Sequence, residues 1–235
     1  MSGGVIAIDG PSASGKSSTA RAVAEALGFA HLDSGSLYRG VTLVALREGV
    51  RRGPGGVTPA ELTPEEILRA AEDRGLMLQS DGVGFSAYLE GEPAEEALRS
   101  PEVTAHVSAI AAIPVVREWV NSRLRAMVRA GQNVVVDGRD IGTVVFPSAD
   151  LKIFLTASPQ ARAGRRISQR GIAAEPGHLD AEAAALAARD HADSTREVAP
   201  LRPAADAVHL DTTSMDFDDQ VRFIVDRARP IFSGR

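Results

Sequence analysis

The stretch GPSASGKSS, residues 10–18, constrains the fold of this chain more than any other feature. Gly10, Gly15, Lys16 and Ser17 fit the pattern G-x-x-x-x-G-K-[S/T], whose glycines let successive backbone N–H groups turn inward around phosphate oxygens. The apolar run VIAID precedes the pattern, and an alanine-rich helical pattern follows it. The sequence therefore predicts a P-loop between a strand and a helix, with triphosphate held at the helix N-terminus.

Lysine is scarce in this chain, since Lys16 and Lys152 are the two lysines among 26 basic residues. Arginine supplies positive charge elsewhere, so Lys16 is expected to do what arginine cannot: a compact ammonium on a flexible stem reaches the β- and γ-phosphates. Ser17 is the expected ligand of Mg²⁺, the cofactor expected with ATP. The residues expected to bind ATP are Gly10, Pro11, Ser12, Ala13, Ser14, Gly15, Lys16, Ser17 and Ser18.

Strand-like apolar runs alternate with helical patterns at both ends of the chain. Residues 5–9, 133–138, 151–157 and 207–211 read as short buried strands, and their β-branched residues favour a parallel α/β sheet covered on both faces. The first expected helix buries a face of Ala20, Val23, Ala24 and Leu27 and ends at Gly28. The last expected helix begins at Thr213 or Ser214 as N-cap and buries a face of Phe217, Val221, Ile224 and Ala228.

The residue pattern of the sequence changes between about residues 49 and 104. A Gly/Pro-rich connection is followed by two alternating runs around SDGVG, residues 80–84, which predict a hairpin. A block of this kind, inserted between core strands, is expected to form a separate small lobe.

Composition narrows the class of protein. The net charge of -5 argues against a broad polyanion-binding surface, so no nucleic-acid partner is expected. No run of about 18 apolar residues is present, and the N-terminus lacks the pattern of a signal peptide, so we expect no membrane partner and a cytoplasmic location. The five histidines show no metal-ligand spacing and are expected to be structural or surface residues.

Among P-loop proteins, a GTPase is disfavoured because its N-K-x-D motif cannot be formed with lysines at 16 and 152 alone. Arginines spread through the chain favour a kinase that neutralises several phosphates. The strings LDSGSLYRG (32–40), VDGRDIGTVVFPSADLKIFL (136–155) and RDHADSTREVAPL (189–201) resemble those of the bacterial cytidylate kinases, a branch of the nucleoside monophosphate kinases. The resemblance covers nearly the whole chain and is weakest from about residue 49 to 100.

The resemblance implies transfer of phosphate from ATP to CMP or dCMP by a monomer with a five-stranded parallel P-loop core. It implies core segments at 1–38, 131–160 and 179–235, a monophosphate-binding lobe at 39–130 and a short lid at 161–178. The alternatives are a kinase with another acceptor, such as UMP or shikimate, a non-catalytic nucleotide-binding regulator, and a nucleic-acid-handling ATPase.

The resemblance also assigns residue roles. Cytosine is read by Ser34, Arg117, Asp140 and Arg196; ribose is contacted by Ser108, Arg189 and Asp193; and the acceptor phosphate is contacted by Tyr38, Arg39 and Arg139. The lid arginines are Arg162, Arg165, Arg166 and Arg170, of which Arg162 and Arg166 are favoured as catalytic together with Lys16 and Arg139. Asp137, at the end of a buried strand, is expected to orient a Mg²⁺-bound water.

Plainer roles stay open for several of these residues. Asp140 could form a salt bridge with Arg139 or cap a helix, and Tyr38 could simply pack. Arg189, Asp193 and Arg196 share one helical face and could form an ion-pair ladder.

Overall fold

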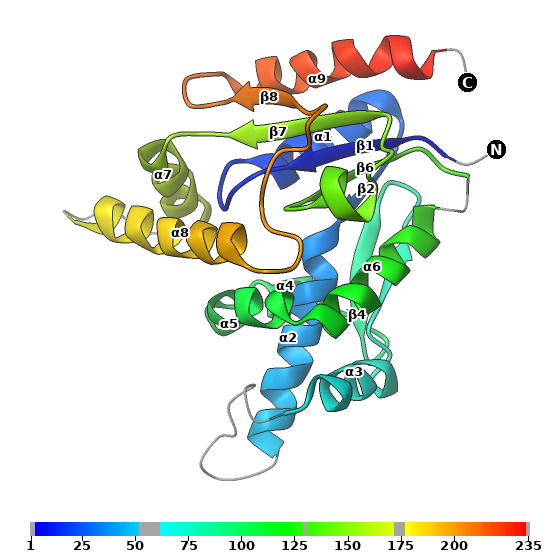
Figure 1. The fold of residues 1–235 in the computed structure, drawn as a ribbon, viewed down its shortest axis with the longest axis vertical. Coiled ribbons are helices and arrows are strands. Elements are labelled where there is room, and N and C mark those ends of the chain that lie inside the picture. Colours follow the sequence, from blue (N-terminus) through cyan, green and yellow to red (C-terminus); the bar gives the residue numbers. More distant parts are fainter. Residues whose placement is uncertain (1–2, 52–61, 129–130, 172–176, 234–235) are drawn as a thin grey trace. The chain divides into compact units, whose positions relative to one another are not determined.

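A computed structural model describes residues 3–51, 62–128, 131–171 and 177–233 (Figure 1). The chain forms two compact units: Met1–Leu32 with Val128–Arg235, here called the core unit, and Asp33–Met127, here called the insert unit. The finer division into core, lobe and lid segments stays a prediction.

The core unit is built on a five-stranded parallel sheet with the strand order β2-β6-β1-β7-β8. The strands are β1 (Val5–Asp9), β2 (Ala30–Asp33), β6 (Val134–Gly138), β7 (Leu151–Thr156) and β8 (Val208–Asp211). The four runs read as strands from the sequence are confirmed. In the register of the sheet, Asp9 lies beside Gly138 of β6 and Phe154 of β7. The loops that follow β1 and β6 therefore leave the sheet at the same edge.

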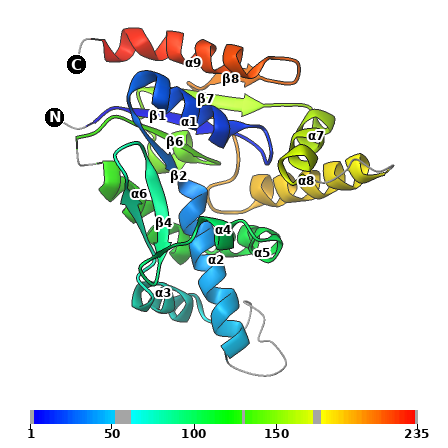
Figure 2. The same ribbon diagram turned by 180° about the vertical axis from the view of Figure 1, so that it is seen from behind.

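The core unit also contains helices, of which the first and the last along the chain pack on the sheet. They are α1 (Lys16–Leu27), α7 (Pro159–Gln169), α8 (His178–Thr195) and α9 (Phe217–Phe232), and a π-helical turn, η2 (Ile141–Val145), follows β6. Figures 1 and 2 both show α1 and α9 side by side, and α7 beside α8. The core contains Ile6, Ile8, Val23, Ile153, Leu155 and Ile224, all nearly or fully buried. Gly28 ends α1 in the left-handed region, as predicted.

The start of α9 differs from the prediction. Its N-cap is Asp216, not Thr213 or Ser214, because the backbone N–H and hydroxyl of Thr213 both donate to the Asp211 carboxylate, at 2.8 and 2.6 Å. Phe217 was expected on the buried face but is 45% exposed. Ile224 and Ala228 are buried as expected, together with Gln220 and Val225.

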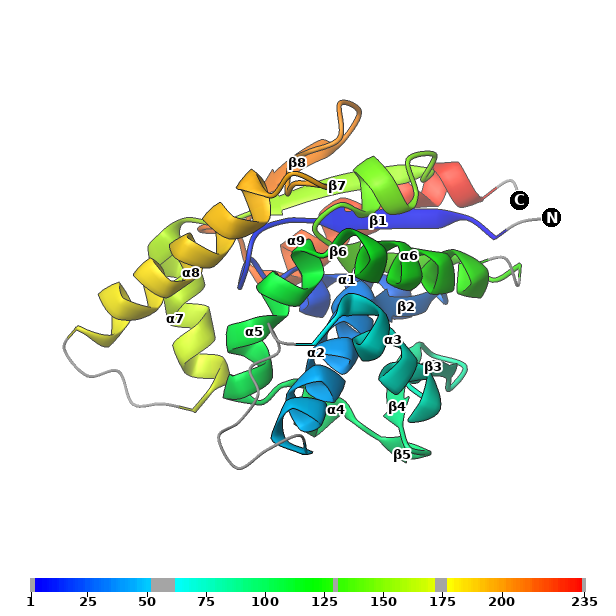
Figure 3. The same cartoon turned by 60° about the horizontal axis from the view of Figure 1, so that its bottom comes forward.

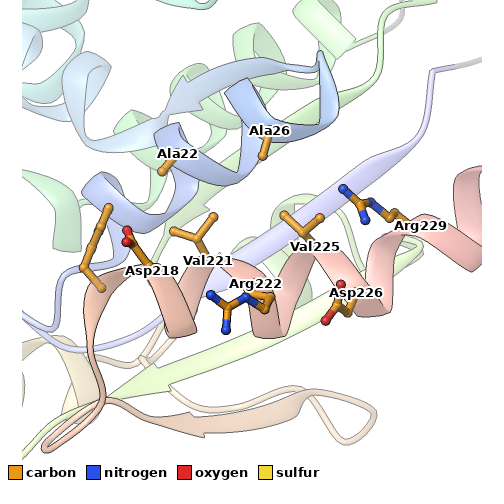
Figure 4. Close-up of a pocket in the computed structure, with 9 residues that line it drawn as sticks. Ala22, Ala26, Asp218, Val221, Arg222, Val225, Asp226 and Arg229 are labelled. Atoms are coloured by element: carbon orange, nitrogen blue, oxygen red, sulfur yellow. The ribbon is translucent and has the colours of Figure 1, made fainter.

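Phe217 borders a shallow groove of about 460 Å³ between α1 and α9 (Figure 4). Ala22 and Ala26 line it from α1, and Val221 and Val225 line it from α9, with charged side chains of α9 around them. The groove is thus a surface hollow between two packed helices.

The insert unit is mostly helical. Its helices are α2 (Ser34–Arg51), α3 (Pro64–Asp73), α4 (Glu95–Leu98), α5 (Pro101–Ala112) and α6 (Pro114–Val128). A small antiparallel sheet contains β3 (Met77–Ser80), β4 (Phe85–Leu89) and β5 (Glu92–Pro93) (Figure 3). The predicted hairpin is confirmed, and its turn is closed by the Asp81 carboxylate, which accepts hydrogen bonds from the N–H groups of Val83 and Gly84.

Residues 52–61 of the expected Gly/Pro-rich connection lie outside the described residues. Within the described part of the chain, no single helix has the length and hydropathy to cross a membrane; α5 and α6 reach these values only as a pair bent by 98°.

Candidate active site

The loop between β1 and α1 has the conformation that phosphate binding requires. Ala13 and Gly15 have positive φ angles, of 57° and 96°, so the backbone curls around the centre of the loop. A Cβ at Gly10 would lie 2.1 Å from the carbonyl oxygen of Leu155, so the neighbouring strand admits only glycine there. The ammonium of Lys16 donates to the carbonyl of Pro11 at 3.0 Å, across the loop. The loop therefore forms a compact cationic cradle at the N-terminus of α1.

Ser12 in this loop is held by side chains from distant segments. Its N–H donates to the carboxylate of Asp190 in α8 at 2.7 Å, and its hydroxyl accepts from Arg139 at 2.9 Å. Arg162 donates to the Ser12 carbonyl at 3.0 Å and also pairs with Asp190. Asp190 was not predicted, although it stands next to Arg189 in the string RDHADS.

A second arginine of α7 also reaches the P-loop. Arg165 donates to the carbonyl of Ser14 at 3.0 Å and to the carbonyl and hydroxyl of Thr212 at 2.5 and 3.0 Å. Arg166, which the sequence favoured, donates to the side chain of Gln169 at 3.3 Å. The structure thus brings Arg162 and Arg165 to the loop, and a catalytic role for Arg166 stays a prediction. Residues 172–176 of the expected lid lie outside the described residues.

Ser17 and Asp137 are adjacent, as their expected roles require. The Ser17 hydroxyl donates to one carboxylate oxygen of Asp137 at 2.5 Å, and His31 Nε2 lies 2.8 Å from the other. Burial opposes ionisation of Asp137, but the hydrogen bond and charge of His31, the charge of Lys16 and the Ser17 hydrogen bond together hold its pKa below the usual value. His31 was expected to be structural or on the surface; it is buried and orients this carboxylate.

The oxygens of Ser17 and Asp137 are donors of the kind that Mg²⁺ prefers. In the described ranges, no group of three or more acidic or histidine side chains is arranged to hold a metal ion. The pair fits a Mg²⁺ that takes its other ligands from triphosphate and water, as in P-loop sites.

Four charged side chains form a network beside the loop that follows β6. Arg139 pairs with Asp193 at 3.0 Å, and Arg196 lies 3.5 Å from Asp140 and 4.0 Å from Asp193. Both carboxylates are buried, with 3–4% of their surface exposed. The salt bridge considered for Asp140 was predicted with Arg139, but Asp140 pairs with Arg196. Of the considered helical ladder, the pair of Asp193 and Arg196 is present, and Asp193 pairs with Arg139 as well; Arg189 lies half-buried in α8.

The insert unit holds the other predicted acceptor residues. Arg117 of α6 is 2% exposed, lies 5.3 Å from the ring centre of Tyr38 in α2, and donates to the carbonyl of Ala111 at 2.9 Å. The Tyr38 hydroxyl donates to Asn121 at 3.4 Å, so its ring and hydroxyl both have partners within the unit.

Three further predicted residues lie on helices of the same unit. Arg39 donates to the Thr104 hydroxyl at 3.1 Å and the Leu98 carbonyl at 3.2 Å. Ser34 is buried in the first turn of α2, and Ser108 is half-buried on α5. Burying a guanidinium costs free energy, and the Tyr38 ring and the Ala111 carbonyl offset part of that cost, so Arg117 and Tyr38 stay candidates for ligand binding.

Comparison with known proteins identifies the family of this chain. Residues 6–230 match the family model described as cytidylate kinase. A cytidylate kinase from Streptomyces griseus is 43% identical over 94% of this chain and 90% of its own length, and one from Rhodococcus jostii is 43% identical over 92% and 91%. A solved gluconokinase from Sinorhizobium meliloti is 17% identical, with a TM-score of 0.48 over 98% of this chain and 94% of its own. The chain belongs to the cytidylate kinase family.

Proposed function

We propose that this chain transfers the γ-phosphate of ATP to CMP or dCMP, giving ADP and CDP or dCDP. Its family membership and the P-loop support the kinase reaction. The observation that carries the choice of acceptor is the buried pair of Asp140 and Arg196, which offers both an acceptor and donors to a polar base edge and lies beside the pair of Asp193 and Arg139. A pyrimidine with an exocyclic amine requires this mixture.

On the ATP side, the P-loop amides and Lys16 bind the β- and γ-phosphates, while Ser17 and Asp137 hold Mg²⁺ directly and through water. Bound Mg²⁺ neutralises charge on the phosphate oxygens. Lys16 stabilises the transferring group because its flexible ammonium can leave the Pro11 carbonyl and follow the charge. Arg162 and Arg166, as lid residues, and Arg139 add positive charge and exclude water that would hydrolyse ATP.

On the acceptor side, no general base is needed, because a CMP phosphate oxygen is already anionic. The protein's task is alignment, which converts the transfer into an effectively unimolecular step. Tyr38, Arg39 and Arg139 bind the acceptor phosphate, and Ser108, Arg189 and Asp193 bind the ribose.

Selection of cytosine rests on the sign of the hydrogen bonds. The carboxylate of Asp140 accepts from the exocyclic amine, and Arg196, Arg117 and Ser34 serve N3 and O2. A uracil presents O4 at the same place, so Asp140 faces an acceptor and both groups lose their partners. Asp140 is therefore the residue most responsible for choosing CMP over UMP.

We also propose that the enzyme works in the cytoplasm as a monomer, without a membrane or nucleic-acid partner. The net charge of -5 supports the absence of a nucleic-acid partner, because it disfavours binding to polyanions.

The test is ADP release from ATP and Mg²⁺ with CMP, dCMP, UMP, AMP, GMP and shikimate offered separately, beside a control without acceptor. Turnover confined to CMP and dCMP is the expected result. Activity with another acceptor would keep the kinase and overturn its substrate. ADP release that does not depend on an acceptor would overturn the proposal as a whole, and so would the absence of ADP release with every acceptor.

A further inference from the structure

The loop that carries Arg139 and Asp140, residues 139–147, is held by a carboxylate from the N-terminal strand of the chain; it is called the β6 loop. One carboxylate oxygen of Asp9, the last residue of β1, accepts the N–H of Ile141 at 2.8 Å, and the other accepts the N–H of Gly142 at 2.8 Å. Asp9 is 4% exposed. It thus grips the two peptide units that directly follow Asp140.

The second lysine of the chain holds the same loop from β7, the strand on the far side of β1. Lys152 of β7 donates to the carbonyl of Pro147 at 2.6 Å and pairs with Asp206 at 2.9 Å. Its stem lies over Gly142, where an added Cβ would come within 3.1 Å of Lys152 Cδ and 3.4 Å of an Asp9 oxygen. The backbone at Gly142 therefore lies closely between Asp9 and Lys152.

The loop needs such support because its backbone is unusual. Asp140 precedes the π-helical turn η2, and its carbonyl accepts from both Val144 at 2.9 Å and Val145 at 3.1 Å. A single π-helical turn is rare and is less favoured than an α-helical one. Asp9 accepts two charge-assisted hydrogen bonds at the start of this turn, and Lys152 donates one just after its end, so the backbone that carries the Asp140 side chain is fixed on both sides.

We propose that Asp9 and Lys152 are positioning residues for base selection: they touch no nucleotide, and they hold the β6 loop so that Asp140 meets the cytosine amine. This inference rests on the proposed function. An error of about 1 Å in a positioned group can cost roughly 10²-fold in rate. A loosened Asp140 loses its advantage for CMP over UMP, because that advantage depends on one correctly placed acceptor.

An asparagine cannot replace Asp9 in this role. Its NH₂ group would face one of the two backbone N–H donors, so one bond of the pair is exchanged for a donor–donor contact. Burial raises the pKa of Asp9 to about 6, against the opposing hydrogen bonds from Gly142 and Ile141, so the carboxylate is mainly ionised at neutral pH and both oxygens accept.

The experiment compares Asp9→Asn and Lys152→Met with the wild type at pH 7.5, with kcat and KM measured for CMP, UMP and ATP. Lys152→Met keeps most of the stem and removes the ammonium. Asp150→Asn is the matched control, because the Asp150 carboxylate accepts the Val5 N–H at 2.8 Å, a bond of the same type at the other end of β1. Asp140→Asn is the reference for lost base selection.

For Asp9→Asn we expect the ratio of kcat/KM for CMP to that for UMP to fall about 10-fold. The ratio for Lys152→Met should fall less, and the KM for ATP should change less than twofold in both. The ratio for Asp150→Asn should stay at the wild-type value. If Asp9→Asn does not fold, Lys152→Met decides the question by the same ratio.

Equal losses with CMP and UMP in both variants would overturn the inference and leave a purely structural role. The two proposals fail in different ways. A wild type that does not prefer CMP overturns the proposed function. A CMP-selective wild type whose preference is lost in Asp140→Asn but kept in Asp9→Asn and Lys152→Met overturns the positioning role alone.

Discussion

The P-loop and the β6 loop follow paired residues of neighbouring parallel strands, Asp9 and Gly138, yet they are specified differently. The P-loop binds its ligand mainly with backbone, and closely spaced glycines with one lysine encode that backbone. The β6 loop presents a side chain, Asp140, and its backbone is held by Asp9, 132 residues away from Ile141, and by Lys152. A site made of backbone can be read from a short window, whereas a site held by distant side chains cannot.

The largest effect is expected from a substitution in the P-loop motif. Lys16→Ala should lower kcat by about 10²–10³-fold, because the charge that follows the transferring phosphate is lost. Lys16→Arg should fail in a similar way, since a rigid guanidinium cannot bend into the loop as the ammonium does. Rapid-quench assays measure the transfer, and calorimetry measures CMP binding, which should stay largely intact. A parallel loss of CMP affinity would show that Lys16 serves the acceptor as well.

The next effect tests the β6 loop itself. Asp140→Ala should reduce the CMP/UMP ratio of kcat/KM by about 5- to 150-fold, the equivalent of about 1–3 kcal/mol for a well-placed base contact. Competition assays with both nucleotides in one reaction measure that ratio directly. Asp180→Ala, which changes an acidic residue in the first turn of α8, is the control and should leave the ratio unchanged. An unaltered ratio in Asp140→Ala would remove Asp140 from base reading.

The same contrast explains what the sequence could predict. The four strands, the hairpin at residues 80–84 and the pairing of Ser17 with Asp137 follow from local pattern or from adjacent strand ends. Asp190 does not, because its partner Ser12 is 178 residues away and an acidic residue on a helix has no distinctive pattern. The predicted N-cap of α9 is wrong because the Thr213 hydroxyl donates to the Asp211 carboxylate. Capping propensity does not reveal this competing hydrogen bond.

Arg165 shows the limit of helical spacing. Both Arg162 and Arg165 reach the P-loop from α7, although the spacing of four residues favoured Arg162 with Arg166. Three-residue and four-residue neighbours share a helix face about equally, so periodicity alone could not choose between Arg165 and Arg166. The carbonyls of Ser14 and Thr212 decide where Arg165 lies, and both are remote in sequence.

A third prediction asks whether the P-loop side also depends on a distant side chain. His31 contacts Asp137, which in turn accepts from Ser17. His31→Leu should raise the Mg²⁺ concentration needed for half-maximal activity, and weaken Mn²⁺ binding measured by electron paramagnetic resonance with ATP, by about 10-fold or more. His31→Gln keeps a donor near the Nε2 position and should recover much of the loss. If metal affinity is unchanged in His31→Leu, the P-loop side does not depend on this distant side chain, and such dependence is limited to the β6 loop.

The smallest effect concerns the stability that Asp9 contributes to the β6 loop. Burial, together with the charge of Asp140, raises the pKa of Asp9 from 3.8 to about 6, while the bonds from Gly142 and Ile141 and the charge of Lys16 oppose this. The folded protein therefore binds the proton more tightly than the unfolded chain. The resulting stabilisation is complete below about pH 4 and is lost as the pH rises through about 6.

Between pH 7 and pH 5 the wild type should consequently gain about 1 kcal/mol in free energy of unfolding relative to Asp9→Asn. Urea denaturation of both proteins at pH 5, 6 and 7 measures this difference. The lowered pKa of Asp137 acts in the opposite direction, but it is present in both proteins and cancels in the comparison. A difference that does not change with pH would mean that Asp9 titrates near its ordinary value, so that the bonds to the β6 loop offset the whole cost of its burial. In that case the β6 loop would hold its carboxylate at no electrostatic cost.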